Sequence, residues 1–170
     1  MLDAARVPDA APEQLRALAT SEYSFVRAAV ARHPATGPDV LAALVPPRLT
    51  GAVEADVASA LAKNPRSPAS ALSVIAALVL PQLGEPRAAP WAIGLGIALC
   101  CHPATPADAV RALLTSPRAA REFRKVAARE SRRADALALL SVDRSEKVRR
   151  AAERSARESG ERREAGDTSS

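Results

Sequence analysis

A short phrase centred on proline recurs along the chain, and this recurrence restricts the fold more than any other feature. The four copies are Val7-Pro8-Asp9-Ala10, His33-Pro34-Ala35-Thr36, Asn64-Pro65-Arg66-Ser67 and His102-Pro103-Ala104-Thr105. Apolar residues stand seven and ten positions after each proline, as the pairs Leu15 and Leu18, Leu41 and Leu44, Leu72 and Ile75, and Val110 and Leu113. A fifth copy has Glu130 in place of the proline but keeps Leu137 and Leu140. Such self-similarity indicates an array of stacked repeats.

A second apolar pattern lies eight, five and four positions before each proline. Its copies are Val26, Ala29 and Val30; Val57, Ala60 and Leu61; Leu95, Ala98 and Leu99; and, near the end of the array, Val148, Ala151 and Ala152. In the fourth repeat the pattern is displaced by one residue, to Phe123, Val126 and Ala127. Spacing of i, i+3 and i+4 places these residues on one face of a helix. Each repeat is therefore expected to be a pair of helices.

The residues after each proline are typical of a helix start. Thr105 is expected to cap the second helix of its repeat, with Pro106 as the first helical residue and Asp108 in the first turn. Thr36 and Ser67 stand at the same place in two other repeats. Proline-bearing insertions over 45–51 and 81–90 lengthen two repeats beyond the base unit, and we expect loops there.

Composition agrees with an all-α protein. Hydrophobic residues make up 48% of the 170 residues but aromatic residues only 2%, so the core must be built from Ala, Leu and Val. Ala, Leu, Arg and Glu dominate, and these are strong helix formers. The apolar stretch over 74–101 is broken by Pro81, Pro86 and Pro90 into pieces shorter than a membrane span, so we expect two buried helices there. Residues 157–170 have almost no large apolar side chain, and we expect a disordered, charged tail.

The segment Val26-Arg27-Ala28-Ala29-Val30-Ala31-Arg32-His33-Pro34-Ala35-Thr36 resembles the leucine-rich repeat variant family. The resemblance implies a right-handed α-solenoid of about five repeats over residues 1–156, in which α-helices alternate with short α or 3-10 helices and no sheet is present. HEAT-like repeats are the neighbouring alternative. Some family members carry a cysteine-rich iron–sulfur segment ahead of the repeats, but this chain has only two cysteines, so no cofactor is expected.

The few residues with catalytic or metal-binding chemistry fit structural roles better. His33 and His102 precede equivalent prolines two repeats apart, on the order of 20 Å, which is too far for a shared metal ion. Cys100 falls at a small buried position of the repeat, whereas Cys101 falls where Arg32 and Lys63 stand. No disulfide framework is present, which favours a cytoplasmic location. We expect neither an enzyme nor a metal site.

Function is expected to lie on the surface of the array. The favoured hypothesis is a scaffold that binds another protein through residues off the apolar stripes, among them Arg27, Arg32 and Lys63. The partner and the oligomeric state are not encoded in any pattern.

The alternative is nucleic-acid binding through a basic face over 118–133. Seven basic and two acidic residues lie between Pro117 and Arg133, so this window alone matches the net charge of +5 of the whole chain. Steps of three or four residues would align five of them on one face of a continuous helix, namely Arg118, Arg121, Lys125, Arg129 and Arg132. Aromatic residues for stacking on bases are absent from this row.

Overall fold

The computed structural model describes residues 10–84, 90–117 and 119–167. Within these ranges the chain forms ten α-helices and one short 3-10 helix, with no strand, which confirms the all-α prediction. The elements are α1 (Pro12–Ala19), α2 (Ser24–Arg32), α3 (Pro38–Ala43), α4 (Ala52–Lys63), α5 (Ala69–Val79), η2 (Leu80–Gly84), α6 (Pro90–Cys101), α7 (Ala107–Thr115), α8 (Arg121–Glu130), α9 (Ala134–Ser141) and α10 (Glu146–Asp167). No helix in these ranges is long and apolar enough to span a bilayer.

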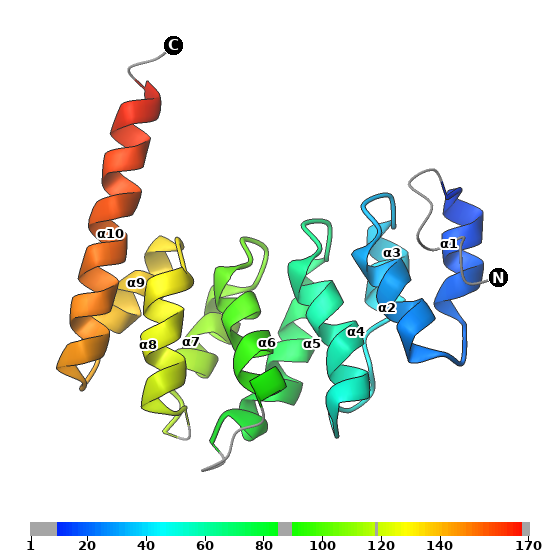
Figure 1. The fold of residues 1–170 in the computed structure, drawn as a ribbon, viewed down its shortest axis with the longest axis horizontal. Coiled ribbons are helices and arrows are strands. Elements are labelled where there is room, and N and C mark those ends of the chain that lie inside the picture. Colours follow the sequence, from blue (N-terminus) through cyan, green and yellow to red (C-terminus); the bar gives the residue numbers. More distant parts are fainter. Residues whose placement is uncertain (1–9, 85–89, 118, 168–170) are drawn as a thin grey trace.

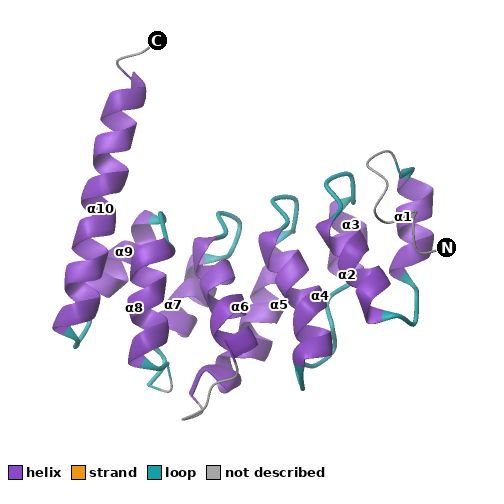
Figure 2. Cartoon of the chain, in the orientation of Figure 1, coloured by secondary structure: helices purple, strands orange, loops and turns teal. Residues whose placement is uncertain are grey.

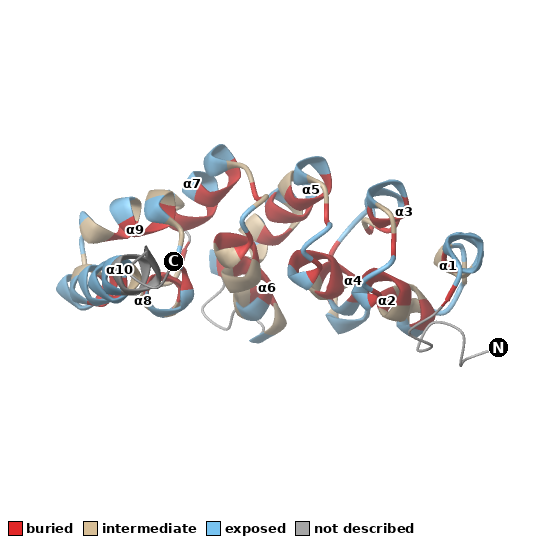
Figure 3. Ribbon diagram, turned by 90° about the horizontal axis from the view of Figure 1, so that it is seen from above, coloured by how far each residue is buried: buried red, intermediate tan, exposed pale blue. Residues whose placement is uncertain are grey.

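The helices form two layers (Figures 1 and 3). One, called here the even layer, contains α2, α4, α6, α8 and α10, and each of these helices packs against the next. The other, the odd layer, contains α1, α3, α5, α7 and α9. Helices α1 and α10 lie at opposite ends of the row (Figure 1). Buried residues face the space between the layers, and exposed residues face outward (Figure 3).

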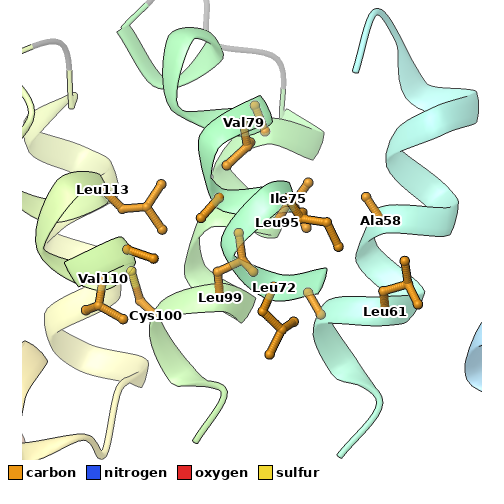
Figure 4. Close-up of a cluster of buried hydrophobic side chains, with 14 of the residues drawn as sticks. Ala58, Leu61, Leu72, Ile75, Val79, Leu95, Leu99, Cys100, Val110 and Leu113 are labelled. Atoms are coloured by element: carbon orange, nitrogen blue, oxygen red, sulfur yellow. The ribbon is translucent and has the colours of Figure 1, made fainter. Parts of the chain in front are cut away.

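The core is built from the residues that recur in the sequence. Leu41, Leu72, Val110 and Leu137 occupy equivalent interior places, and so do Leu44, Ile75, Leu113 and Leu140; all eight are buried. Leu18 of the first repeat is only partly buried. Figure 4 shows how Leu72 and Ile75 of the odd layer meet Leu61, Leu95 and Leu99 of the even layer. The periodicity therefore predicted the interior correctly.

The described turns of the repeated phrase lie along one edge of the molecule (Figure 2), and buried side chains of Asn64, His102 and Ser131 join their turns to the turn before. Asn64 Nδ2 donates to the carbonyl oxygens of Ala31 and His33, at 2.7 and 3.3 Å. His102 Nε2 lies 2.9 Å from the carbonyl oxygen of Asn64, which it reaches as a donor because Nδ1 accepts from the backbone N–H of Ala104.

This geometry explains why asparagine and histidine interchange before the proline. Asn64 Oδ1 accepts from the N–H two residues later, as Nδ1 of His33 and of His102 does. Asn64 Nδ2 and His102 Nε2 both donate to the preceding turn. Both side chains thus offer one acceptor and one donor in the same two directions. The structural interpretation of the histidines agrees with these contacts.

The expected helix caps are different in the structure. Gly37, Pro68 and Pro106 occupy the N-cap positions, and none of them makes a side-chain capping bond. The hydroxyls of Thr36 and Ser67 donate instead to carbonyl oxygens near the end of the preceding helix, those of Val30 and Leu61, at 2.7 and 2.6 Å. These carbonyls belong to the last turns of α2 and α4, and they also accept from the backbone N–H groups of His33 and Asn64, at 3.1 Å. The prediction of Thr and Ser caps was therefore wrong, since Thr36 and Ser67 bond to the preceding helix and the Thr105 hydroxyl has no partner among the described residues.

The fourth turn is shorter than the others, since three residues separate α8 from α9 whereas five separate α6 from α7, and this explains the displaced apolar pattern around Phe123. Ser131 takes the place of His102, and its hydroxyl donates to the carbonyl oxygen of Cys100 at 3.0 Å. The guanidinium of Arg133 donates to the carbonyl oxygens of His102 and Thr105, at 2.6 and 2.7 Å. One long side chain therefore supplies contacts that the missing proline turn would have made.

Helix α10 continues through residues that we expected to be disordered. It runs to Asp167, whereas the sequence predicted a disordered tail over 157–170. Its first half is held by buried apolar side chains, including Val148, Ala151 and Ala152. Beyond this anchor, Arg, Glu and Ala favour continued helix by intrinsic propensity. The division of the chain into a repeat domain over 1–156 and a tail stays a prediction, but the described part of that tail is helical.

Candidate interaction surface

The outer surface of the even layer carries most of the residues singled out from the sequence. Four residues stand at equivalent places there, because each directly follows a buried pair in the last turns of its helix: Arg32 in α2, Lys63 in α4, Cys101 in α6 and Arg129 in α8. Three of the four are cations, and a cation in the last turn interacts favourably with the helix dipole. The fold thus gathers Arg32, Lys63 and Arg129, which lie far apart in the sequence, into one row.

Two of these cations are available to a partner. Arg32 pairs with Asp56, so this charge links α2 to α4, although both side chains are about half exposed, at 54% and 47%. Lys63 and Arg129 are exposed, and neither has an ion pair with a residue that the structure describes. Lys63 and Arg129 are therefore the free charges of the row.

Arg27 is used inside the protein. Its guanidinium donates to the carbonyl oxygens of Ser21 and Glu22, at 2.6 and 2.9 Å. Arg149 makes the corresponding bond to the carbonyl oxygen of Asp143, at 2.7 Å. These arginines fix the loop that leads into their own helix. A partner would meet Arg27 as a partly buried side chain that is already engaged.

The basic face expected over 118–133 is not one helical row. Helix α8 spans Arg121–Glu130, so Arg132 lies beyond its end, and Arg118 lies outside the described residues. Arg132 pairs with Glu158 of α10 at 3.6 Å. The continuous helix that a single row would need is therefore not present, since the chain turns at Ser131 to begin the next repeat.

Acidic neighbours partly neutralise the remaining members of this row. Glu122 pairs with Lys125 and, at 3.4 Å, with Arg121. The hydrogen bond from Lys125 is the main cause that lowers the pKa of Glu122 below its usual value, and the positive charges of both partners add to it. Arg129 is the member of the row that keeps its charge unpaired among the described residues.

Helix α10 adds cations that the sequence analysis did not single out. Lys147, Arg150 and Arg154 are exposed and follow steps of i, i+3 and i+7, which places them on one face of α10. Helix α10 packs beside α8, so these residues extend the basic surface. Residues 119–161 hold twelve Lys and Arg against eight Asp and Glu, a net charge of +4. The spacing was visible in the sequence, but the pairing of α10 with α8 was not.

One basic residue of the window is structural. Arg124 and Asp143 form an ion pair with 2.6 Å between Nε and Oδ2, and their side chains are only 4% and 9% exposed. Arg124 also donates to the carbonyl oxygen of Ala119. Breaking a buried pair leaves an uncompensated charge, so this contact holds α8 against the loop before α10.

An aromatic pair marks the other end of the even layer. Tyr23 and Phe25, at the start of α2, are 65% and 50% exposed. Their ring centroids lie 5.5 Å apart with an interplanar angle of 36°. Exposed aromatic residues are enriched among those that contribute most to protein–protein binding. The structure thus leaves both side chains largely in solvent.

The cysteines and histidines form no metal site in the described ranges, where no group of three or more His, Cys, Asp and Glu is placed to hold an ion. Burial, with a contribution from Cys101, raises the pKa of Cys100 to about 12. Burial also raises the pKa of Cys101, and Glu130 acts in the same direction. Neither thiol is therefore activated as a nucleophile.

Comparison of the chain with protein-family models, with curated proteins and with solved structures found no match.

Proposed function

We propose that this chain is an α-solenoid scaffold that binds another protein through the outer surface of its even layer. The repeated phrase and the two layers of paired helices support a repeat array of the leucine-rich repeat variant or HEAT-like kind. Such arrays use extended surfaces to bind their partners. The proposed role is non-catalytic.

The observation that carries this proposal is that the buried polar residues and the exposed polar residues have different roles. The buried polar side chains of the repeated phrase bond to backbone groups and hold neighbouring repeats together, as Asn64, His102 and Ser131 do. The exposed residues of the even layer make few hydrogen bonds to the backbone of a neighbouring repeat. They include the Tyr23–Phe25 pair and the unpaired cations Lys63 and Arg129. A surface with aromatic anchors and charges is suited to protein recognition.

Crosslinking during affinity capture from the native cells tests this proposal. We expect a partner whose crosslinks map to the even layer, and whose recovery falls when Tyr23 and Phe25 are both changed to Ala. Val74, on the odd layer, is also 50% exposed, so Val74→Ala is a matched control that should leave recovery unchanged. Crosslinks confined to the odd layer would contradict the proposal.

A second candidate is nucleic-acid binding, which the net charge of +4 over residues 119–161 favours. Binding to duplex DNA or to RNA should then weaken steeply between 50 and 200 mM salt, because phosphate contacts release counterions. Changing Arg121, Lys125 and Arg129 together to Glu should abolish it. If the chain does not bind either nucleic acid at low salt, this candidate is wrong.

A further inference from the structure

Helix α6 differs from every other helix of the even layer because it has no charged residue. Its sequence is PWAIGLGIALCC, from Pro90 to Cys101. The core-facing side is explained by burial of Leu95, Leu99 and Cys100. Ile97 and Ala98 also pack against the core, but both stay partly exposed, whereas a helix with only one buried side normally has a polar outer face.

The outer side of α6 is defined by Gly94, Ile97 and Cys101, with Ala98 beside them. The first three follow steps of i, i+3 and i+7, and so lie along one line on the helix. Gly94 is exposed, and Ile97, Ala98 and Cys101 are partly exposed. These four residues are called here the apolar strip. Figure 3 shows that buried and partly exposed residues make up most of α6.

The strip stands where the neighbouring helices carry polar residues. The places of Gly94, Ile97 and Cys101 are taken in α4 by Asp56, Ser59 and Lys63, and in α8 by Glu122, Lys125 and Arg129. Because α6 packs between α4 and α8, an apolar line is bordered on both sides by polar lines. The fold itself tolerates polar residues at these places, as both neighbours show. The fold therefore does not require an apolar residue at each of these places, although Ile97 and Ala98 also pack against the core.

The charged residues beside the strip that lack an ion pair are cations. Asp56 is held by Arg32, and Glu122 is held by Lys125 and Arg121. Lys63 and Arg129, on either side of Cys101, have no ion pair with any described residue. A ligand that covers the strip would thus be flanked by two free cations.

We propose that the apolar strip binds an amphipathic helix of a partner protein, with an apolar stripe that covers Gly94, Ile97 and Ala98 and with acidic residues that meet Lys63 and Arg129. Apolar residues at i, i+3, i+4 and i+7 are the pattern by which one helix lies on an apolar surface. Complementary charges at the rim select the partner and orient it. This inference rests on the proposed scaffold function, and names the surface and the partner chemistry within it.

The test is a selection of random 16-residue peptides, displayed on phage, against the full chain. We expect enriched peptides to have a net negative charge and an apolar repeat at i, i+3, i+4 and i+7. The best peptide is then synthesised with a fluorophore and titrated by anisotropy. Gly94→Glu should weaken its binding about tenfold or more, because the new charge would be buried without a partner under the peptide. Lys63→Glu with Arg129→Glu should weaken it as well, and added salt should do the same.

The controls separate this inference from the proposed function. A Cβ at Gly94 would have no atom within 4 Å, so Gly94→Glu should fold normally, which circular dichroism verifies. Val74→Glu on the odd layer should not affect binding. Selected peptides that are not acidic, or that bind Gly94→Glu equally well, would overturn the inference but leave a protein scaffold standing. If no peptide is enriched while the chain binds a single-stranded oligonucleotide, both proposals fail.

Discussion

Two glycines of α6 provide a sharp test of how α6 packs against α8. Both Gly94 and Gly96 lie inside the helix, so intrinsic propensity alone predicts that changing either to Ala stabilises the protein by about 0.5–1 kcal/mol. A Cβ at Gly94 would meet nothing within 4 Å. A Cβ at Gly96 would lie 2.8 Å from Cε2 of Phe123 and 3.2 Å from Cδ2 of Leu83, both of which are fully buried.

The two substitutions are therefore expected to have opposite signs. Overpacking a buried site costs about 1–3 kcal/mol, so Gly96→Ala should destabilise the protein by about 1–2 kcal/mol after the gain in helix propensity. Gly94→Ala should stabilise it by up to about 1 kcal/mol. Urea unfolding monitored by circular dichroism measures both changes.

A second substitution identifies the atom that causes the clash. Phe123→Leu removes Cε2 and Cζ, so it should suppress much of the cost of Gly96→Ala, as a coupling measured in a double-mutant cycle. If Gly94→Ala and Gly96→Ala stabilise the protein equally, α8 does not approach α6 as described. The same conclusion would follow if Phe123→Leu did not change the cost of Gly96→Ala.

Three further predictions follow from buried polar groups. Thr36→Val should cost about 1–2 kcal/mol because it removes a buried hydrogen bond, whereas Thr105→Val should be neutral or stabilising, since the Thr105 hydroxyl has no partner among the described residues; equal costs in urea unfolding would contradict this. Arg124→Met should cost about 3–5 kcal/mol in the same assay by leaving Asp143 buried and unpaired, and Asp143→Asn added to it should recover part of that loss. Burial raises the pKa of Cys100 to about 12, so the folded state holds this proton more tightly than the unfolded chain, in which the pKa is about 8.5. The resulting contribution to stability is complete below pH 8.5 and is lost as pH rises toward 12. The free energy of unfolding of the wild type should therefore fall more over this range than that of Cys100→Ala. If the two free energies fall in parallel with pH, the raised pKa of Cys100 is wrong.

The sequence predicted the interior well because burial follows simple periodicity. Leu72 and Val110 could be placed in the core from their distance to a proline, since every repeat solves the same packing problem. The periodic pattern also revealed that Phe123 is displaced by one residue. It could not reveal the cause, which is the shorter turn at Ser131.

Contacts between distant residues could not be predicted in this way. Arg124 and Asp143 lie 19 residues apart, and no periodic rule pairs them. The predicted basic row would share one face only on a continuous helix, but the structure places Arg132 in the turn after α8. The exposed side of α6 was read as core, because composition alone does not tell which face of an apolar helix lacks a neighbour.

Small-angle X-ray scattering of the monomeric chain tests the central claim most directly, because stacked helix pairs extend in one direction and a globule does not. A compact domain of 170 residues has a radius of gyration of about 15 Å. A row of stacked helix pairs should give a clearly larger value, with an asymmetric distance distribution and a Kratky curve that returns to the baseline as it does for a folded protein. A symmetric distribution with a radius of about 15 Å would contradict it.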